Sequence, residues 1–373
     1  MHPTLKRLCY SAVATLNTGS LQKMSPVEVL IPYHHLVSDE PVPYIQSLYA
    51  FKNSRQFETD LDYLLRNFRA LTLPEVIQQQ QEQLLRQQEQ HPQPDTPAGK
   101  KGFLLCFDDG LRQVYEVVAP ILLRKGVPAA LFVNPAFVDN KQIFYSLQKG
   151  WLLHWLAGSP GGNILTPDAP LPVRSKPLNA KFLRTASQLF GHPLHTGAQL
   201  RQSILSINYL NRHLIAQLGA LLDLDPETAL RDQQPFMTLD QLKELNAKGF
   251  AIGAHSIDHP LYSLIAPEEQ IRQTLESVDW VTRTFGLPYK AFAFPHVDTG
   301  VGDAFFRQLV HPPNPALDLI LGNSTGMLEK HPRVLHRFIG ENPAIPMEKM
   351  AKAVLAYSIG TKLTGRSFVQ RGL

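Results

Sequence analysis

Three polar clusters in this chain could act together on a bound cation. Asp108 and Asp109 end the apolar run Gly102 to Phe107, and the run His255-Ser256-Ile257-Asp258-His259-Pro260 follows the apolar stretch Phe250 to Ala254. Pro295-His296 follows the apolar stretch ending at Phe294. Two imidazoles four residues apart can reach one metal ion, and a carboxylate would complete a set that leaves coordination positions open for water and substrate. A second carboxylate could then take the proton of an attacking water.

Each cluster alone has a simpler interpretation. One His-x-x-x-His pair is expected about half the time by chance in a chain of this length with 14 histidines, and Asp-Gly after a strand favours a turn. Burying two carboxylates at the end of an apolar strand costs free energy, however, unless a cation or a hydrogen-bond donor pairs with them. A shared cation explains the carboxylates and the imidazoles together.

The strands and helices that position these clusters can be predicted from the sequence. Short apolar runs alternate with amphipathic helical patterns. Strands are expected at 27–32, 102–107, 129–133, 250–254 and 291–294, with one more at 316–321. Helices are expected at 111–124 and 267–285, and capping boxes at Thr72-Glu75 and Thr238-Gln241 open two others. This alternation predicts an α/β fold with parallel strands, as an open sheet or a barrel, in which strand carboxyl ends share one face.

The clusters also resemble known motifs. Phe107-Asp108-Asp109-Gly110, the 255–260 run and Phe294-Pro295-His296 are similar to the three leading motifs of the polysaccharide deacetylases, the NodB-homology group of carbohydrate esterases. Pro32-Tyr33-His34 matches a Tyr-His often found on the first strand in that family, and the resemblance spans Val27 to Ile339.

The resemblance implies a distorted (β/α) barrel of about seven parallel strands that holds a divalent metal ion, Zn²⁺ first, with Co²⁺, Ni²⁺ or Mn²⁺ as alternatives. Asp108 would be the general base, and Asp109, His255 and His259 would be the metal ligands. His34, Pro295 and His296 would contact substrate, and the His296 backbone N–H would stabilise the oxyanion.

Two later motifs depart from the family. Ala293 stands where an arginine usually steadies the base, and His296 stands where a tyrosine is usual. Val334-Leu335-His336 approximates the Leu-any-His motif whose histidine protonates the leaving amine. His336 is therefore the candidate general acid, with His34, His35 or His296 as alternatives.

Two stretches interrupt the alternation. The Gln- and Pro-rich residues 78–100 are expected to form a polar insertion, helical at first and then a linker, and residues 134–235 a partly helical insertion. The predicted domain therefore covers 27–345, after an N-terminal extension at 1–26 and before a C-terminal helix or tail at 346–373.

Composition excludes several other classes of protein. Hydrophobic residues make up 44% of the chain, and the net charge of +4 is spread too thinly for a nucleic-acid partner. Two cysteines give no disulfide framework, and Cys106 is expected to be a buried small residue. There is no apolar run long enough for a transmembrane segment and no convincing signal peptide, so a cytoplasmic location is expected.

These observations together predict a metal-dependent de-N-acetylase, a hydrolase of carbon–nitrogen bonds other than peptide bonds. Its substrate would be an acetylated amino sugar, glycan or glycan precursor. Two alternatives stay open: hydrolysis of a non-sugar amide, or a metal-containing carbohydrate-binding protein with weakened turnover. If the 134–235 insertion covers the site, a short or lipid-linked saccharide is expected to fit better than a polymer.

Overall fold

The computed structural model describes residues 13, 15–88, 100–157, 180–311, 315–331 and 333–372. Half of the predicted N-terminal extension, the linker part of the Gln-rich insertion and the 158–179 part of the second insertion lie outside these residues.

Eight strands form a nearly closed parallel barrel, which confirms the predicted fold class. The eight-stranded sheet runs in the order β10-β9-β8-β7-β6-β5-β2-β11, and every pairing in it is parallel. The strands are β2 (Pro32–His34), β5 (Leu105–Asp108), β6 (Ala129–Val133), β7 (Ala251–Ala254), β8 (Ala291–Ala293), β9 (Leu319–Gly322), β10 (Val334–His336) and β11 (Phe338–Ile339).

One stretch of chain closes the barrel from both sides. β10 pairs with β9, whereas β11, one residue later, pairs with β2. Residues 334–339 therefore connect the last and first strands, and Arg337 lies at the point where the pairing changes sides. Below the site, β1 (Val29–Leu30), β4 (Gly102–Phe103) and β3 (Arg69–Ala70) form a small parallel sheet that extends the first two barrel strands.

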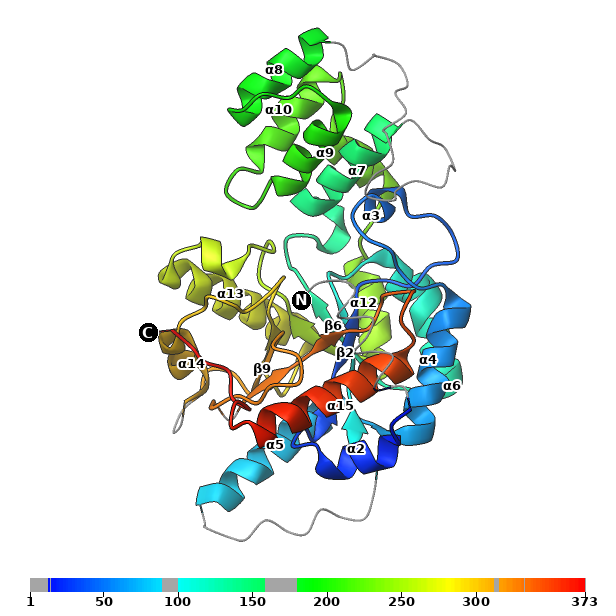
Figure 1. Ribbon diagram of the computed structural model, residues 1–373, viewed down its shortest axis with the longest axis vertical. Helices are drawn as coiled ribbons and strands as arrows, with labels where there is room; N and C mark the ends of the chain where they lie inside the picture. The colour runs from blue at the N-terminus through cyan, green and yellow to red at the C-terminus, as the bar shows by residue number, and fades with distance from the viewer. Residues whose placement is uncertain are drawn as a thin grey trace.

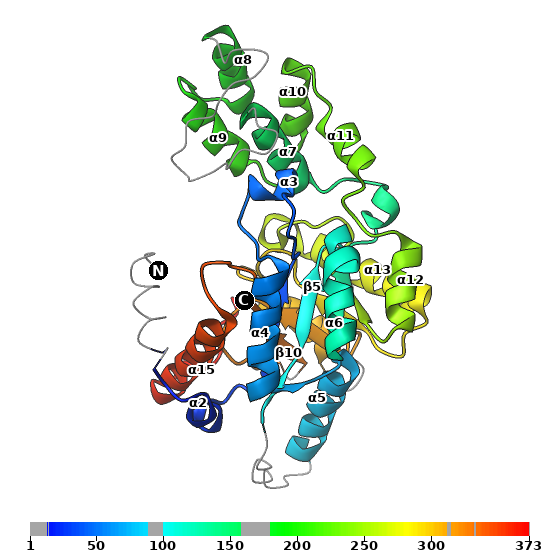
Figure 2. The ribbon, with the colours of Figure 1, turned by 90° about the vertical axis from the view of Figure 1, so that its right-hand side faces the viewer.

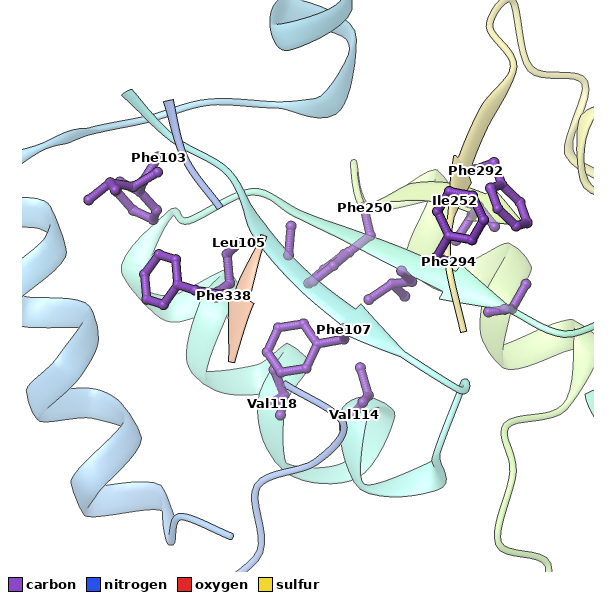
Figure 3. Close-up of a cluster of buried hydrophobic side chains, with 14 of the residues drawn as sticks. Phe103, Leu105, Phe107, Val114, Val118, Phe250, Ile252, Phe292, Phe294 and Phe338 are labelled. Atoms are coloured by element: carbon purple, nitrogen blue, oxygen red, sulfur yellow. The ribbon is translucent and has the colours of Figure 1, made fainter. Parts of the chain in front are cut away.

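Side chains alternate between the barrel interior and the surrounding helices. Leu104 and Cys106 belong to an interior cluster with Phe132, whereas Leu105 and Phe107 pack outward. Figure 3 shows the outward set, in which Phe107 lies near Val114 and Val118 of the following helix. Cys106 is fully buried, as predicted. This alternation has a period of two, so it decides which residues at the strand ends can reach the site.

Helices surround the barrel and also form a separate layer beyond one end of it (Figures 1 and 2). Those around the barrel and at its opposite end are α2 (Thr18–Met24), α4 (Ser54–Asn67), α5 (Leu73–Gln88), α6 (Ala119–Lys125), α12 (Leu239–Ala247), α13 (Pro267–Phe285), α14 (Asp303–Val310) and α15 (Met347–Leu363). Both predicted capping boxes form, since Thr72 and Glu75 bond each other's backbone N–H, as do Thr238 and Gln241.

The helical layer has its own hydrophobic core. It contains α3 (Pro43–Gln46), α7 (Tyr145–Ala157), α8 (Ala180–Phe190), α9 (Gly197–Ser206), α10 (His213–Leu221) and α11 (Pro226–Gln233). Five of these six helices lie in the predicted 134–235 insertion, whereas α3 comes from the loop after β2. The layer is therefore built from two separate stretches of chain. In the part of the chain that the structure describes, no helix is long and apolar enough to cross a membrane.

Candidate active site

The carboxyl ends of β5 and β7 bring together a carboxylate and two imidazoles. Asp109 Oδ1 lies 3.1 Å from His259 Nε2 and 3.6 Å from His255 Nε2. All three side chains are buried. Ligand atoms in a tetrahedral zinc site with bonds of ~2.0–2.2 Å lie about 3.3–3.6 Å apart, so the spacing fits a shared metal ion.

Protonation and hydrogen bonding also suit a metal. His255 Nδ1 donates to the Ala293 carbonyl at 2.8 Å, which leaves Nε2 free to bind a cation when the ring is neutral. Burial lowers the pKa of His255 to about 4, so the ring is neutral at pH 7. Burial opposes ionisation of Asp109, but the adjacent His259 holds the pKa of this carboxyl well below its usual range. Asp109 Oδ1 is buried without a hydrogen-bond partner. Asp109, His255 and His259 are therefore a candidate metal site, whose composition and spacing suit a divalent ion.

The loops that carry these groups have an uncommon backbone conformation. Asp109, Ser256, His259 and His296 all have positive φ, between 55° and 68°. For residues other than glycine this region costs of order 1–3 kcal/mol each. The cost is offset in part by buried bonds: Asn134, directly after β6, donates to the carbonyls of His255 and Ser256. Asn134 is a supporting residue that sequence reasoning missed.

Asp108 points into the barrel and pairs with Arg337. Arg337 Nη1 donates to Asp108 Oδ1 at 2.7 Å, and Nη2 donates to the Phe294 carbonyl at 3.3 Å. Both side chains are almost completely buried. Arg337 thus supplies the arginine that was expected at Ala293, but from the strand that closes the barrel. Its sequence signal was a lone arginine within the mostly apolar stretch Val334 to Ile339.

His35, not His34, lies in the site. His35 Nδ1 is 2.8 Å from Glu341 Oε1, and about one-fifth of the His35 side chain is exposed. Burial opposes protonation, but the Glu341 carboxylate raises the pKa of His35 to about 10, so the ring is a cation at pH 7. The predicted substrate contact through His34 is corrected: its ring is fully buried against Phe57 and Phe107, on the outer side of the strand.

The candidate general acid His336 is also corrected. It precedes the inward-facing Arg337, so the alternation of the strand turns its side chain outward. Its Nδ1 accepts from Ser324 N at 3.2 Å, and its Nε2 lies 3.6 Å from Glu329 Oε2. Arg371 also pairs with Glu329, at 2.7 Å. His336 therefore belongs to a buried ionic cluster beside the barrel and does not line the cavity over the metal site.

A cavity of about 290 Å³ lies over these groups. Asp108, Asp109, His255 and His259 lie at its base, and His35, Tyr33 and His296 line its sides. Pro295 is buried next to His296, whose side chain is exposed. Tyr145 of α7 places its hydroxyl 3.3 Å from His296 Nε2. The remaining walls come from the helical layer and consist of Ile45, Leu48, Tyr49, Phe144, Ser146, Leu147 and Lys149.

Residues 224–301 match the sequence profile of the polysaccharide deacetylase family. The matched segment includes His255, His259 and His296. This segment is therefore similar to the polysaccharide deacetylases. This confirms the predicted resemblance, and with it the enzyme class: a hydrolase of carbon–nitrogen bonds other than peptide bonds. Asp108, Asp109, His35 and Arg337 lie outside the matched segment, so their assignment rests on the geometry described above.

Several solved deacetylase structures are similar to this chain. Streptococcus pyogenes deacetylase PplD, in complex with acetate, is 16% identical, with a TM-score of 0.49 over 88% of this chain and 99% of that one. IcaB from Ammonifex degensii is 15% identical, with a TM-score of 0.43 over 90% and 98%. The de-N-acetylase from Aggregatibacter actinomycetemcomitans is 13% identical, with a TM-score of 0.48 over 87% and 99%. Comparison with curated proteins finds no match.

Proposed function

We propose that this protein removes acetyl groups from an N-acetylated amino sugar by metal-dependent hydrolysis. The observation that carries the proposal is the meeting of three groups in one cavity: the Asp109-His255-His259 set, the Asp108–Arg337 pair and the His35–Glu341 pair. Zn²⁺ is the proposed metal, because one carboxylate and two imidazoles suit it. When bound, such an ion polarises a carbonyl and acidifies water.

The chain's own residues then divide the proton transfers. Asp108, held by Arg337 through Oδ1, takes a proton from the water that attacks the acetyl carbonyl carbon. The His296 backbone N–H is the proposed donor to the resulting oxyanion. As the carbon–nitrogen bond breaks, the imidazolium of His35 gives its proton to the leaving nitrogen. The products are acetate and the free amine.

The His35 assignment rests on its place and its charge. A general acid must be protonated before it acts and must lie within reach of the leaving group. His35 meets the first condition through Glu341 and the second by lining the cavity beside Asp109. Of the alternatives considered from sequence, His34 is buried in the core and His336 lies beside the barrel.

Purified protein incubated with fully acetylated chito-oligosaccharides and Zn²⁺ or Co²⁺ should release acetate and free amine in equal amounts. Chelation should stop the reaction, and added metal should restore it. Binding of the sugar without release of acetate would instead favour the carbohydrate-binding alternative. The absence of the family arginine at Ala293 favours that alternative, whereas the pairing of Arg337 with Asp108 supports turnover. A cytoplasmic location stays a prediction, to be checked by cell fractionation.

A further inference from the structure

Two segments of the helical layer form a roof over the site. The first is α3 with the residues after it, which contribute Ile45, Leu48 and Tyr49 to the cavity. The second is the start of α7 with the residue before it, and it contributes Phe144, Leu147 and Lys149. Both views show α3 beneath α7, on the side of the helical layer that faces the barrel (Figures 1 and 2). The cavity is thus bounded below by the metal site and above by packed helix.

The two segments of the roof, α3 and the start of α7, pack closely against each other. A Cβ added at Gly150 of α7 would lie 1.8 Å from the Tyr44 carbonyl oxygen, so only glycine allows this approach of α7 to α3. Tyr44 and Ile45 are buried in the core of the helical layer. Lys149, also buried, donates to the Ile207 carbonyl at 2.6 Å and so ties α7 to the end of α9. The roof therefore has the packing of a folded core.

The helical layer that contains the roof is also fastened to the loops that carry the site. The Tyr209 hydroxyl donates to Asp258 Oδ2 at 2.7 Å, between the two metal-site histidines. The ring of Phe144 lies 4.2 Å from that of His259, centre to centre, and Tyr145 approaches His296. Three separate contacts would have to break before the roof could lift. The substrate must consequently fit beneath it.

We infer that the site accepts one acetylated sugar unit at the end of a chain, or a free short saccharide, and excludes internal units of a polymer. This inference rests on the proposed function. The volume of about 290 Å³ lies at the lower limit of the ~300–1,000 Å³ usual for small-molecule sites. An internal unit would need a groove open at both ends, so that the chain could continue past the reacting sugar. Here α3 and the start of α7 contribute walls to the cavity over the site.

The first test is a length series on the full chain reconstituted with Zn²⁺. Acetylated chito-oligosaccharides of one to six units are compared by kcat/KM, and the products are sequenced by mass spectrometry. We expect one acetyl group lost per chain, from a terminal unit, and kcat/KM that changes less than about threefold from the dimer to the hexamer. Internal deacetylation, or kcat/KM rising about tenfold or more with length, would overturn the inference while leaving the deacetylase function intact. No release from any member of the series would overturn both.

The second test alters the roof. Gly150→Ala must push α7 and α3 apart, so we expect it to admit internal units and to raise activity on the hexamer relative to the dimer. Gly360→Ala is the matched control, because Gly360 is also helical and an added Cβ there meets nothing within 4 Å. Metal content and melting temperature show whether each variant is folded. Should Gly150→Ala fold poorly, Tyr209→Phe removes one roof contact with little change in volume and should shift the length preference in the same direction. An unchanged length preference in a folded Gly150→Ala or Tyr209→Phe protein would contradict the role of the roof.

Discussion

Replacing Arg337 by methionine should slow catalysis without removing the metal. The substitution deletes a charge-assisted hydrogen bond of 2.7 Å to Asp108 and a bond of 3.3 Å to the Phe294 carbonyl. A hydrogen bond to a charged group contributes about 1.5–3 kcal/mol. If this energy serves to orient the base, its loss lowers the rate by roughly 10–150-fold. We therefore expect kcat to fall by about 10²-fold with little change in KM. The free energy of unfolding should also fall by about 3–5 kcal/mol, because Asp108 is left buried and unpaired.

The assay should separate this positioning role from a structural one. Steady-state kinetics, bound metal and thermal unfolding are measured for Arg337→Met, and for Arg333→Met as a control four residues earlier. Arg337→Lys keeps the charge but loses the fork of donors, so it should recover part of the rate. In an Asp108→Asn background, Arg337→Met should have almost no further effect on kcat, since its action passes through Asp108. A folded, metal-loaded Arg337→Met protein with kcat within about twofold of the parent would refute the reasoning.

The other predictions concern the metal and the protons. His259→Ala should lose bound metal, measured by elemental analysis after dialysis, because two ligands hold a divalent ion poorly; stoichiometric metal in this variant would contradict the assignment. Asp108→Asn should reduce the rate by ~10²–10⁴-fold and keep its metal, whereas Asp109→Asn should lose metal, and the opposite pattern would exchange the two roles. Activity should fall as pH rises through about 10, where His35 loses its proton, and Glu341→Gln should move this fall toward the ordinary histidine range near ~6.5. An alkaline limb unchanged in Glu341→Gln would exclude His35 as the acid.

Much of the barrel was predictable because its signals are local. Continuous apolar runs predicted the strands, capping boxes predicted two helix starts, and the helix Pro267–Phe285 was predicted to the residue. The same strands identified Asp108, Asp109, His255 and His259, since polar residues directly after buried parallel strands share one face.

The two wrong assignments at the site, His34 and His336, were each wrong by one position along a strand. His34 and His336 each stand next to the residue that faces the site, His35 and Arg337. A shift of one position moves a side chain to the opposite face, and composition alone does not set that register. The role of α3 in the roof was also not predictable. Its four residues are too few for a periodic signal, and their contact with α7 depends on Gly150, about 100 residues later.

Because residues 334–339 close the barrel, the parts of the site become available at different times during synthesis. All three metal-site residues have been made once His259 leaves the ribosome, but Arg337 follows roughly 80 residues later, or ~4–16 s at ~5–20 residues per second. Asp108 and Arg337 are 229 residues apart, and His35 and Glu341 are 306 apart. Contacts at such separations form late in folding. A nascent chain, or one cleaved before residue 334, would therefore carry the metal-site residues while its base and acid lack their partners. On the proposed mechanism, the stretch that completes the fold also completes the site, so the chain would be inactive until the barrel has closed.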